Sequence, residues 1–217
     1  MRTKMSALTG VTAAVTAGLL AWAVPAQAAV VTLSQGHVDA VDVAFEDGEF
    51  EISVHDETVD PDVERDPADV ILLAKPEAAV TVPDDPRYGF LGTPGATVHI
   101  LPEVEDENLL WAGLATEEVE AGVFVGDTVQ IRFTRLVGPN GFSLFTTDPT
   151  GAPNVLVDSE DGLPDVVTRP VGGHLHANWA FEGAGTYRIK VEATGRLAAT
   201  GQRVTSDPVW LTFQVQR

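Results

Sequence analysis

Histidines are the residues of this chain whose type and spacing best suit chemistry. Only five occur, and His174 and His176 stand two residues apart in a segment that alternates polar and apolar side chains. A β-strand places every second side chain on the same face, so both imidazoles should project together, opposite Leu175 and Ala177. Two imidazoles on one side of a strand can reach a single metal ion.

A second pair of histidines flanks a predicted β-hairpin. His37 begins an alternating apolar segment and His55 ends the next one, with Asp47 and Gly48 between them as a tight turn. Both histidines are nearly equidistant from that turn, so antiparallel pairing should bring them close together. The sequence therefore predicts one metal site built from both pairs: His37, His55, His174 and His176.

The donor types indicate which metal this site would hold. The chain has no cysteine, so thiolate ligands are excluded, and an imidazole-rich set suits zinc best, ahead of manganese, iron, nickel or copper. Asp39 or Asp56 could add a carboxylate ligand or orient an imidazole through a hydrogen bond. The alternative interpretation is that these are ordinary surface histidines at strand ends. His99, on a predicted strand from Ala96 to Leu101, is left out of the site.

Other signatures of chemistry are weaker. The segment from Asp158 to Asp165 is similar to an acidic calcium loop, but its carboxylates and glycine are one residue out of step. An Asp-Gly turn between two strands is therefore the favoured interpretation. The sequence holds no G-x-S-x-G, H-E-x-x-H or phosphate-binding glycine loop. We expect a protein that is not an enzyme and has no catalytic residues.

The elements that position the histidines are predicted to be strands. Short alternating segments separated by Gly, Pro and Asp recur along the chain, for example around Val41, Phe50, Ile131 and Tyr187. Helical periodicity is confined to the segment from Glu103 to Glu120, where one or two short helical turns are expected. The pattern predicts an all-β fold with at most short helical turns. We expect an antiparallel β-sandwich, immunoglobulin-like or jelly-roll-like, forming one domain over residues 29–217.

The first 28 residues have the three parts of a cleavable secretory signal peptide. Arg2 and Lys4 precede an uncharged apolar stretch, and Ala26-Gln-Ala28 forms a small-x-small cleavage site. We therefore expect an exported protein, secreted or extracellular, with no membrane span in the mature chain. The chain carries 13 basic and 32 acidic residues, which makes nucleic acid and anionic membrane surfaces poor partners and divalent cations compatible ones.

Several motifs together are similar to those of a known family. They are Gln35-Gly-His-Val-Asp39, Val54-His-Asp-Glu-Thr58, Phe142-Ser-Leu-Phe145, His174-Leu-His-Ala-Asn-Trp-Ala-Phe181 and Gly185-Thr-Tyr-Arg188. With them the chain resembles the choice-of-anchor M domain, also described as the actinobacterial surface-anchored protein domain. The resemblance implies an exported cell-envelope protein of high-GC Gram-positive bacteria, often encoded beside an ABC transporter of the metal-uptake type. It points to the same four histidines.

Members of that family usually carry a linker and an anchor after the domain, whereas this chain ends at Arg217. We therefore expect a freely secreted protein, or one loosely associated with the cell surface. The leading hypothesis is a secreted β-sandwich that captures a divalent metal, with zinc as the preferred candidate, and serves an uptake transporter. Its metal affinity should fall as the histidines protonate near pH 6. The first alternative is an interaction module for an envelope protein or a glycan, and the second is a secreted hydrolase.

Overall fold

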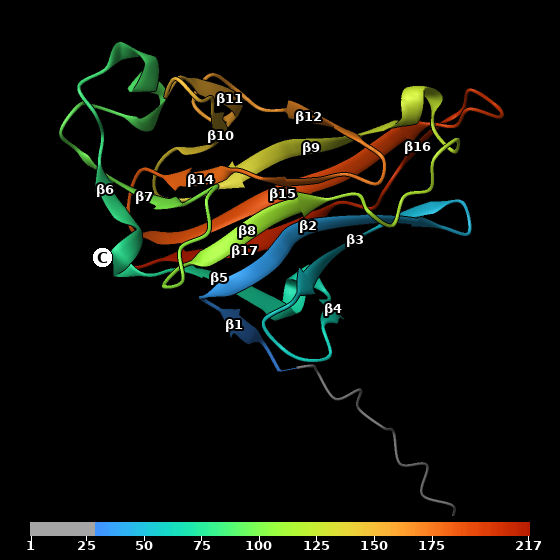
Figure 1. The fold of residues 1–217 in the computed structure, drawn as a ribbon, viewed down its shortest axis with the longest axis horizontal. Coiled ribbons are helices and arrows are strands. Elements are labelled where there is room, and N and C mark those ends of the chain that lie inside the picture. The colour runs from blue at the N-terminus through green and yellow to red at the C-terminus, as the bar shows by residue number, and fades with distance from the viewer. Residues whose placement is uncertain (1–28) are drawn as a thin grey trace, which may run out of the picture.

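The protein is an all-β sandwich built from three sheets, as the alternating sequence segments predict. The computed structural model describes residues 29–217, and the predicted signal peptide lies outside this range. Figure 1 shows long strands of two sheets running past one another, with the third sheet at one end. No helix in residues 29–217 has the length and apolar character needed to cross a membrane.

The sheet that carries the histidines has five strands. In spatial order they are β13 (His174–His176), β8 (Leu110–Ala115), β2 (Gly36–Glu46), β3 (Glu49–Asp56) and β4 (Val63–Arg65). The hairpin of β2 and β3 forms as predicted, with Glu46 opposite Glu49. Asp47 and Gly48 both have positive φ, 51° and 89°, which is the conformation that a two-residue hairpin turn requires.

The largest sheet forms the opposing layer of the sandwich. Its strands in spatial order are β1 (Val31–Leu33), β5 (Val70–Ala74), β17 (Val209–Val215), β15 (Gly185–Arg196), β9 (Thr128–Val137) and β12 (Asp165–Pro170), and β16 (Arg203–Thr205) pairs with β15. Figure 1 shows β2 and β8 lying across β15 and β17. The pairs β1–β5 and β5–β17 are parallel, as is β2–β8 in the first sheet, so the sandwich is mixed rather than purely antiparallel.

The third sheet and four short stretches of 3-10 helix complete residues 29–217. The sheet consists of β11 (Pro153–Asp158), β10 (Phe142–Thr147), β14 (Asn178–Phe181), β7 (Thr97–Leu101) and β6 (Ala79–Thr81). The helical turns are η1 (Pro67–Asp69), η2 (Pro76–Ala78), η3 (Pro86–Leu91) and η4 (Val125–Asp127). The calcium-like segment is the turn between β11 and β12, which agrees with the favoured interpretation.

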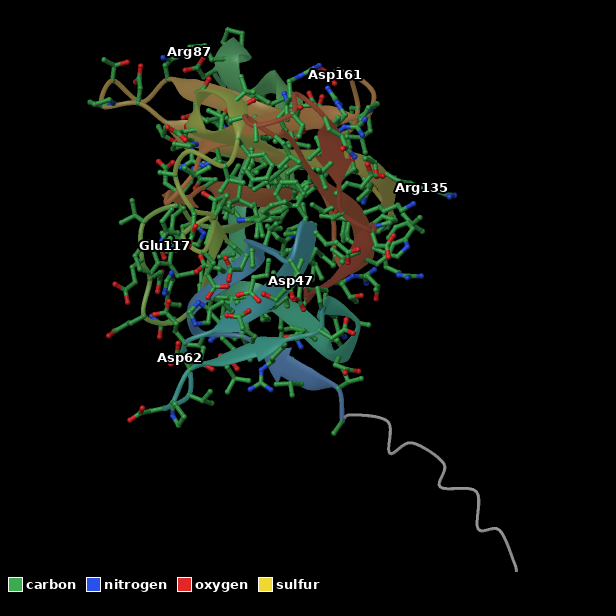
Figure 2. The ribbon with its side chains drawn as sticks, turned by 90° about the vertical axis from the view of Figure 1, so that its right-hand side faces the viewer. Asp47, Asp62, Arg87, Glu117, Arg135 and Asp161 are labelled. Carbon is green, nitrogen blue, oxygen red and sulfur yellow. The ribbon has the colours of Figure 1, made fainter. Side chains whose placement is uncertain are left out.

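One apolar core joins the three sheets. Val43, Leu114, Ile131, Phe213 and Trp179 are all essentially inaccessible to solvent and belong to one cluster of packed side chains. Figure 2 shows carbon-rich side chains crowded in the interior of the molecule. Burying each large apolar side chain contributes roughly 1.5–3 kcal/mol, so this core, rather than any single hairpin, holds the histidine-bearing sheet in place.

Two sequence expectations differ from the structure. The segment from Glu103 to Glu120 holds no helical turn; its centre is strand β8, because Leu110, Ala112 and Leu114 alternate into the core. The segment from His174 to Phe181 is not one strand. It changes sheets at Ala177, so that β13 pairs with β8 and β14 pairs with β10 and β7. The expected core face is nevertheless kept, with Trp179 donating its indole N–H to the Ala112 carbonyl at 3.2 Å.

Candidate metal centre

A β-bulge in β2 turns His37 and Asp39 away from the core. From Asp42 to Glu46 the strand pairs regularly with β3, but the register shifts between Asp39 and Asp42. The parallel pairing with β8 shifts at the same place. One extra residue reverses the face to which all preceding side chains point. His37 and Asp39 therefore share a face with Asp42, although simple alternation would place them with Val41 and Val43.

Across the same face runs a row of directly paired residues that spans all five strands. Starting from β13, the paired positions in that row are His176, Gly113, Asp39, His55 and Glu64. Directly paired residues lie about 4.5–5.5 Å apart and point the same way. The sheet therefore lines up two imidazoles and two carboxylates, with Gly113 between His176 and Asp39.

A neighbouring row brings in the remaining polar groups. His174 pairs with Ala115, Ala115 with Asp42, and Asp42 with Ser53. His37 pairs with Trp111 on the other side of the first row. Polar side chains from four strands thus converge on one patch of the sheet.

Three of the predicted histidines form a compact trio. The ring centres of His37, His174 and His176 are 4.8–5.1 Å apart, and one nitrogen from each lies within 4.8 Å of the others. The Nε2 atoms of His37 and His174 are 3.4 Å apart. This is the spacing from which three imidazoles can converge on one cation.

Asp39 is a fully buried carboxylate against this trio. Its Oδ1 lies 2.6 Å from His174 Nε2 and 3.8 Å from His37 Nε2, while Oδ2 lies 3.8 Å from His55 Nδ1. Burial raises the pKa of Asp39, and the imidazoles of His174 and His37 act in the opposite direction. A carboxylate out of water needs a cation or donors beside it, so this position favours a bound positive charge.

Some buried carboxylate oxygens beside the trio have no hydrogen-bond partner. Within residues 29–217, buried acceptor atoms of Asp39 and Asp42 lack a conventional hydrogen-bond partner, although Asp39 Oδ1 lies 2.6 Å from His174 Nε2. Such atoms are costly in a folded protein unless an ion or water satisfies them. Asp39 Oδ2 and Asp42 Oδ1 are therefore the acceptors at this patch that an ion or water could satisfy.

Gly113 allows the donors to pack directly against the backbone of β8. It pairs with both Asp39 and His176, and a Cβ built on it would meet the Asp39 carboxylate and come within 2.9 Å of His174 Nε2. Its backbone is extended, so the need for glycine here is purely steric. A side chain at this position would collide with the Asp39 carboxylate and crowd His174 and His176.

His176 is held in its neutral form. Its ring stacks on Trp111 at 3.6 Å between centres and 9° between planes, and the Trp111 indole N–H donates to the Glu103 carbonyl at 3.0 Å. Burial, followed by repulsion from His174 and His37, lowers the pKa of His176 to about 4. Only a neutral imidazole can ligate a metal, so this residue is ready to bind at neutral pH.

His55 lies next to the trio but belongs to another group of donors. Its Nε2 is 2.8 Å from Asp62 Oδ2 and 3.7 Å from Glu64 Oε1. Burial alone would lower the pKa of His55, but the hydrogen bond to Asp62 and the nearby carboxylates outweigh it and raise the pKa. Figure 2 labels Asp62 at the lower edge of the molecule, in the loop before β4. His55 thus borders the trio at Asp39, while its closest contact is with Asp62.

The other residues considered from the sequence lie elsewhere. Asp56 is buried, but it accepts hydrogen bonds from Arg65 and Thr58, which fully engage it away from the trio. His99 is buried on β7 in another sheet, as its omission from the site anticipated. Sequence reasoning missed Gly113, Trp111, Asp42 and Glu64. Their roles depend on pairing between distant strands, and no local pattern signals them.

Asp42 offers a test of the electrostatics without any metal. It is 4% exposed, and burial, with repulsion from Glu64, Asp39 and Glu118, raises its pKa from 3.8 to about 7. The folded chain therefore keeps this proton up to about pH 7, while the unfolded chain loses it near pH 4. The stabilisation that protonated Asp42 gives to the fold is fully present below pH 4 and is lost as the pH rises through 7.

In metal-free protein, Asp42→Asn should therefore become progressively more stable than the wild type from about pH 4 to pH 7. The difference should reach a plateau on the order of 4 kcal/mol. Urea unfolding at a series of pH values, with a chelator present, measures it. Asp47→Asn, in the exposed hairpin turn, is the control for charge loss. Parallel pH profiles for Asp42→Asn and the wild type would contradict the burial argument.

No family model, curated protein or solved structure matches the chain.

Proposed function

We propose that this protein is an exported metal-binding protein that captures a transition-metal dication through His37, His174 and His176. One observation carries the proposal. Three imidazoles with nitrogen atoms within 4.8 Å of one another meet a buried carboxylate over a glycine, whose missing Cβ lets Asp39 and His174 lie against the backbone. Three neutral nitrogen donors suit zinc best among the divalent metals.

Each residue has a separate part in this binding. His37, His174 and His176 supply nitrogen donors, and Asp39 supplies negative charge and a candidate fourth donor at Oδ1. Glu57, half-exposed, lies 2.9 Å from His37 Nδ1 and fixes the orientation of that ring. Orientation of ligating imidazoles by carboxylates is a common support for metal affinity.

The biological setting of this binding is an inference from the sequence. The resemblance to the choice-of-anchor M domain supports an exported, non-catalytic accessory to a metal-type ABC transporter, acting outside the cell or loosely at its surface. The signal-peptide pattern and the acidic composition are consistent with that setting. In such a role the protein would deliver its metal to an uptake system.

Isothermal titration of chelator-treated protein with zinc tests the binding. We expect a dissociation constant tighter than ~10 μM at pH 7.5, proton release on binding, and weaker affinity below about pH 6. His176, with its pKa of about 4, should stay neutral throughout this range and keep its ring available to bind a metal. Binding weaker than ~10 μM would refute the proposal and favour the interaction module.

A further inference from the structure

A second group of donors lies beside the histidine trio. Asp42 on β2, His55 on β3 and Glu64 on β4 each place one ligand-type atom within 4.8 Å of the others. The group is assembled by strand pairing, because Glu64 is directly opposite His55 and Asp42 is directly opposite Ser53. Ser53 Oγ donates a hydrogen bond to Glu64 Oε2 and so holds that carboxylate over the sheet.

The state of Asp42 independently points to a ligand. Its side chain is 4% exposed, and Oδ1 has no hydrogen-bond partner among the residues that the structure describes. A solvated acidic surface would not leave a buried oxygen unpartnered. A cation between Asp42, His55 and Glu64 would satisfy it.

Asp39 connects the two groups of donors. Its Oδ1 faces His174, and its Oδ2 faces the Nδ1 of His55 at 3.8 Å. The Nε2 of His55 lies 2.8 Å from Asp62 Oδ2 and 3.7 Å from Glu64 Oε1. One buried carboxylate therefore stands between the trio and the second group, with one oxygen toward each.

We propose that the protein holds two adjacent cation positions with different chemistry, separated by Asp39. The second position, at Asp42, His55 and Glu64, offers two carboxylates and one imidazole. This harder donor set suits an oxygen-preferring dication such as Mn²⁺ better than the trio does. The inference goes beyond the proposed function and rests on it only in that Asp39 borders both positions.

Electron paramagnetic resonance of free Mn²⁺ tests the second position. The full mature chain, loaded with one equivalent of zinc, is titrated with Mn²⁺ and the unbound ion is counted. We expect about one Mn²⁺ per chain, and a loss of affinity of at least about tenfold in Asp42→Asn and in Glu64→Gln. Glu64 is half-exposed, so Glu64→Gln should fold normally and keeps the test valid if Asp42→Asn does not. Glu51→Gln, exposed on the same strand as His55, is the control for charge loss and should bind as the wild type does.

Two further measurements separate this inference from the proposed function. His176→Ala should lose zinc and retain Mn²⁺. Retained Mn²⁺ binding that depends on Asp42, with no zinc binding, would overturn only the proposed function. No Mn²⁺ binding to zinc-loaded protein, or Mn²⁺ binding that is insensitive to both Asp42→Asn and Glu64→Gln, would overturn the second position.

Discussion

Replacing His174 with alanine should weaken zinc binding at least about 100-fold. Loss of an outer hydrogen-bond partner alone costs 10–100-fold in metal affinity, and His174 is placed to be a direct donor. Its Nε2 lies between His37 Nε2 at 3.4 Å and Asp39 Oδ1 at 2.6 Å, so its removal takes away the ring that joins the trio to the carboxylate. Competition with a chromophoric chelator at pH 7.5 measures the change.

His55→Ala is the matched control for His174→Ala. Both side chains are about three-quarters buried, at 23% and 27% exposed, and both touch Asp39. Because His55 belongs to the neighbouring donor group, its loss should weaken zinc binding less than about tenfold. Equal losses in the two variants would instead support the four-histidine site that the sequence predicts. Unchanged zinc affinity in His174→Ala would remove the trio from consideration altogether.

Placing one methyl group at position 113 should abolish zinc binding and destabilise the fold by about 1–3 kcal/mol. The added Cβ would meet the Asp39 carboxylate and crowd His174 and His176. Asp39 is fully buried beneath the neighbouring strands, so it has little room to yield. Zinc titration and chemical unfolding of Gly113→Ala measure the two effects.

Gly89→Ala serves as the control for that substitution. Gly89 has no positive φ, and a Cβ built there meets nothing within 4 Å. The alanine should be neutral or stabilising by at most about 1 kcal/mol, because it only restricts the unfolded chain. If Gly113→Ala behaved like Gly89→Ala in both assays, the close packing at Gly113 would have no part in zinc binding.

The sequence was sufficient for the fold class and for most strands. Two local signals agree with the structure. One is the alternation of Val129, Ile131 and Phe133, and the other is the Asp47-Gly48 turn. Strand β8 was mistaken for helical turns because Leu110, Trp111 and Leu114 have helical spacing when considered alone. The core favours the two-residue period of a strand over the 3.6-residue period of a helix, because it buries Leu110, Ala112 and Leu114 together.

For the candidate site, the sequence indicates the residue types better than their arrangement. The pairing of His174 with His176 on one face follows from their spacing alone. The position of His37 depends on a bulge that reverses the face of β2, and no local motif marks that extra residue. The parallel contact between β2 and β8 joins segments about seventy residues apart, so Gly113 could not be connected to Asp39 from the sequence.

The order of the strands in the histidine-bearing sheet bears on when a metal can be acquired. His37 and His174 are 137 residues apart along the chain and meet only after β8 has paired with both β2 and β13. An unfolded chain therefore has no assembled trio. Under the proposed function, an ion would be bound only after this sheet is complete, so it would be drawn from the compartment in which folding finishes.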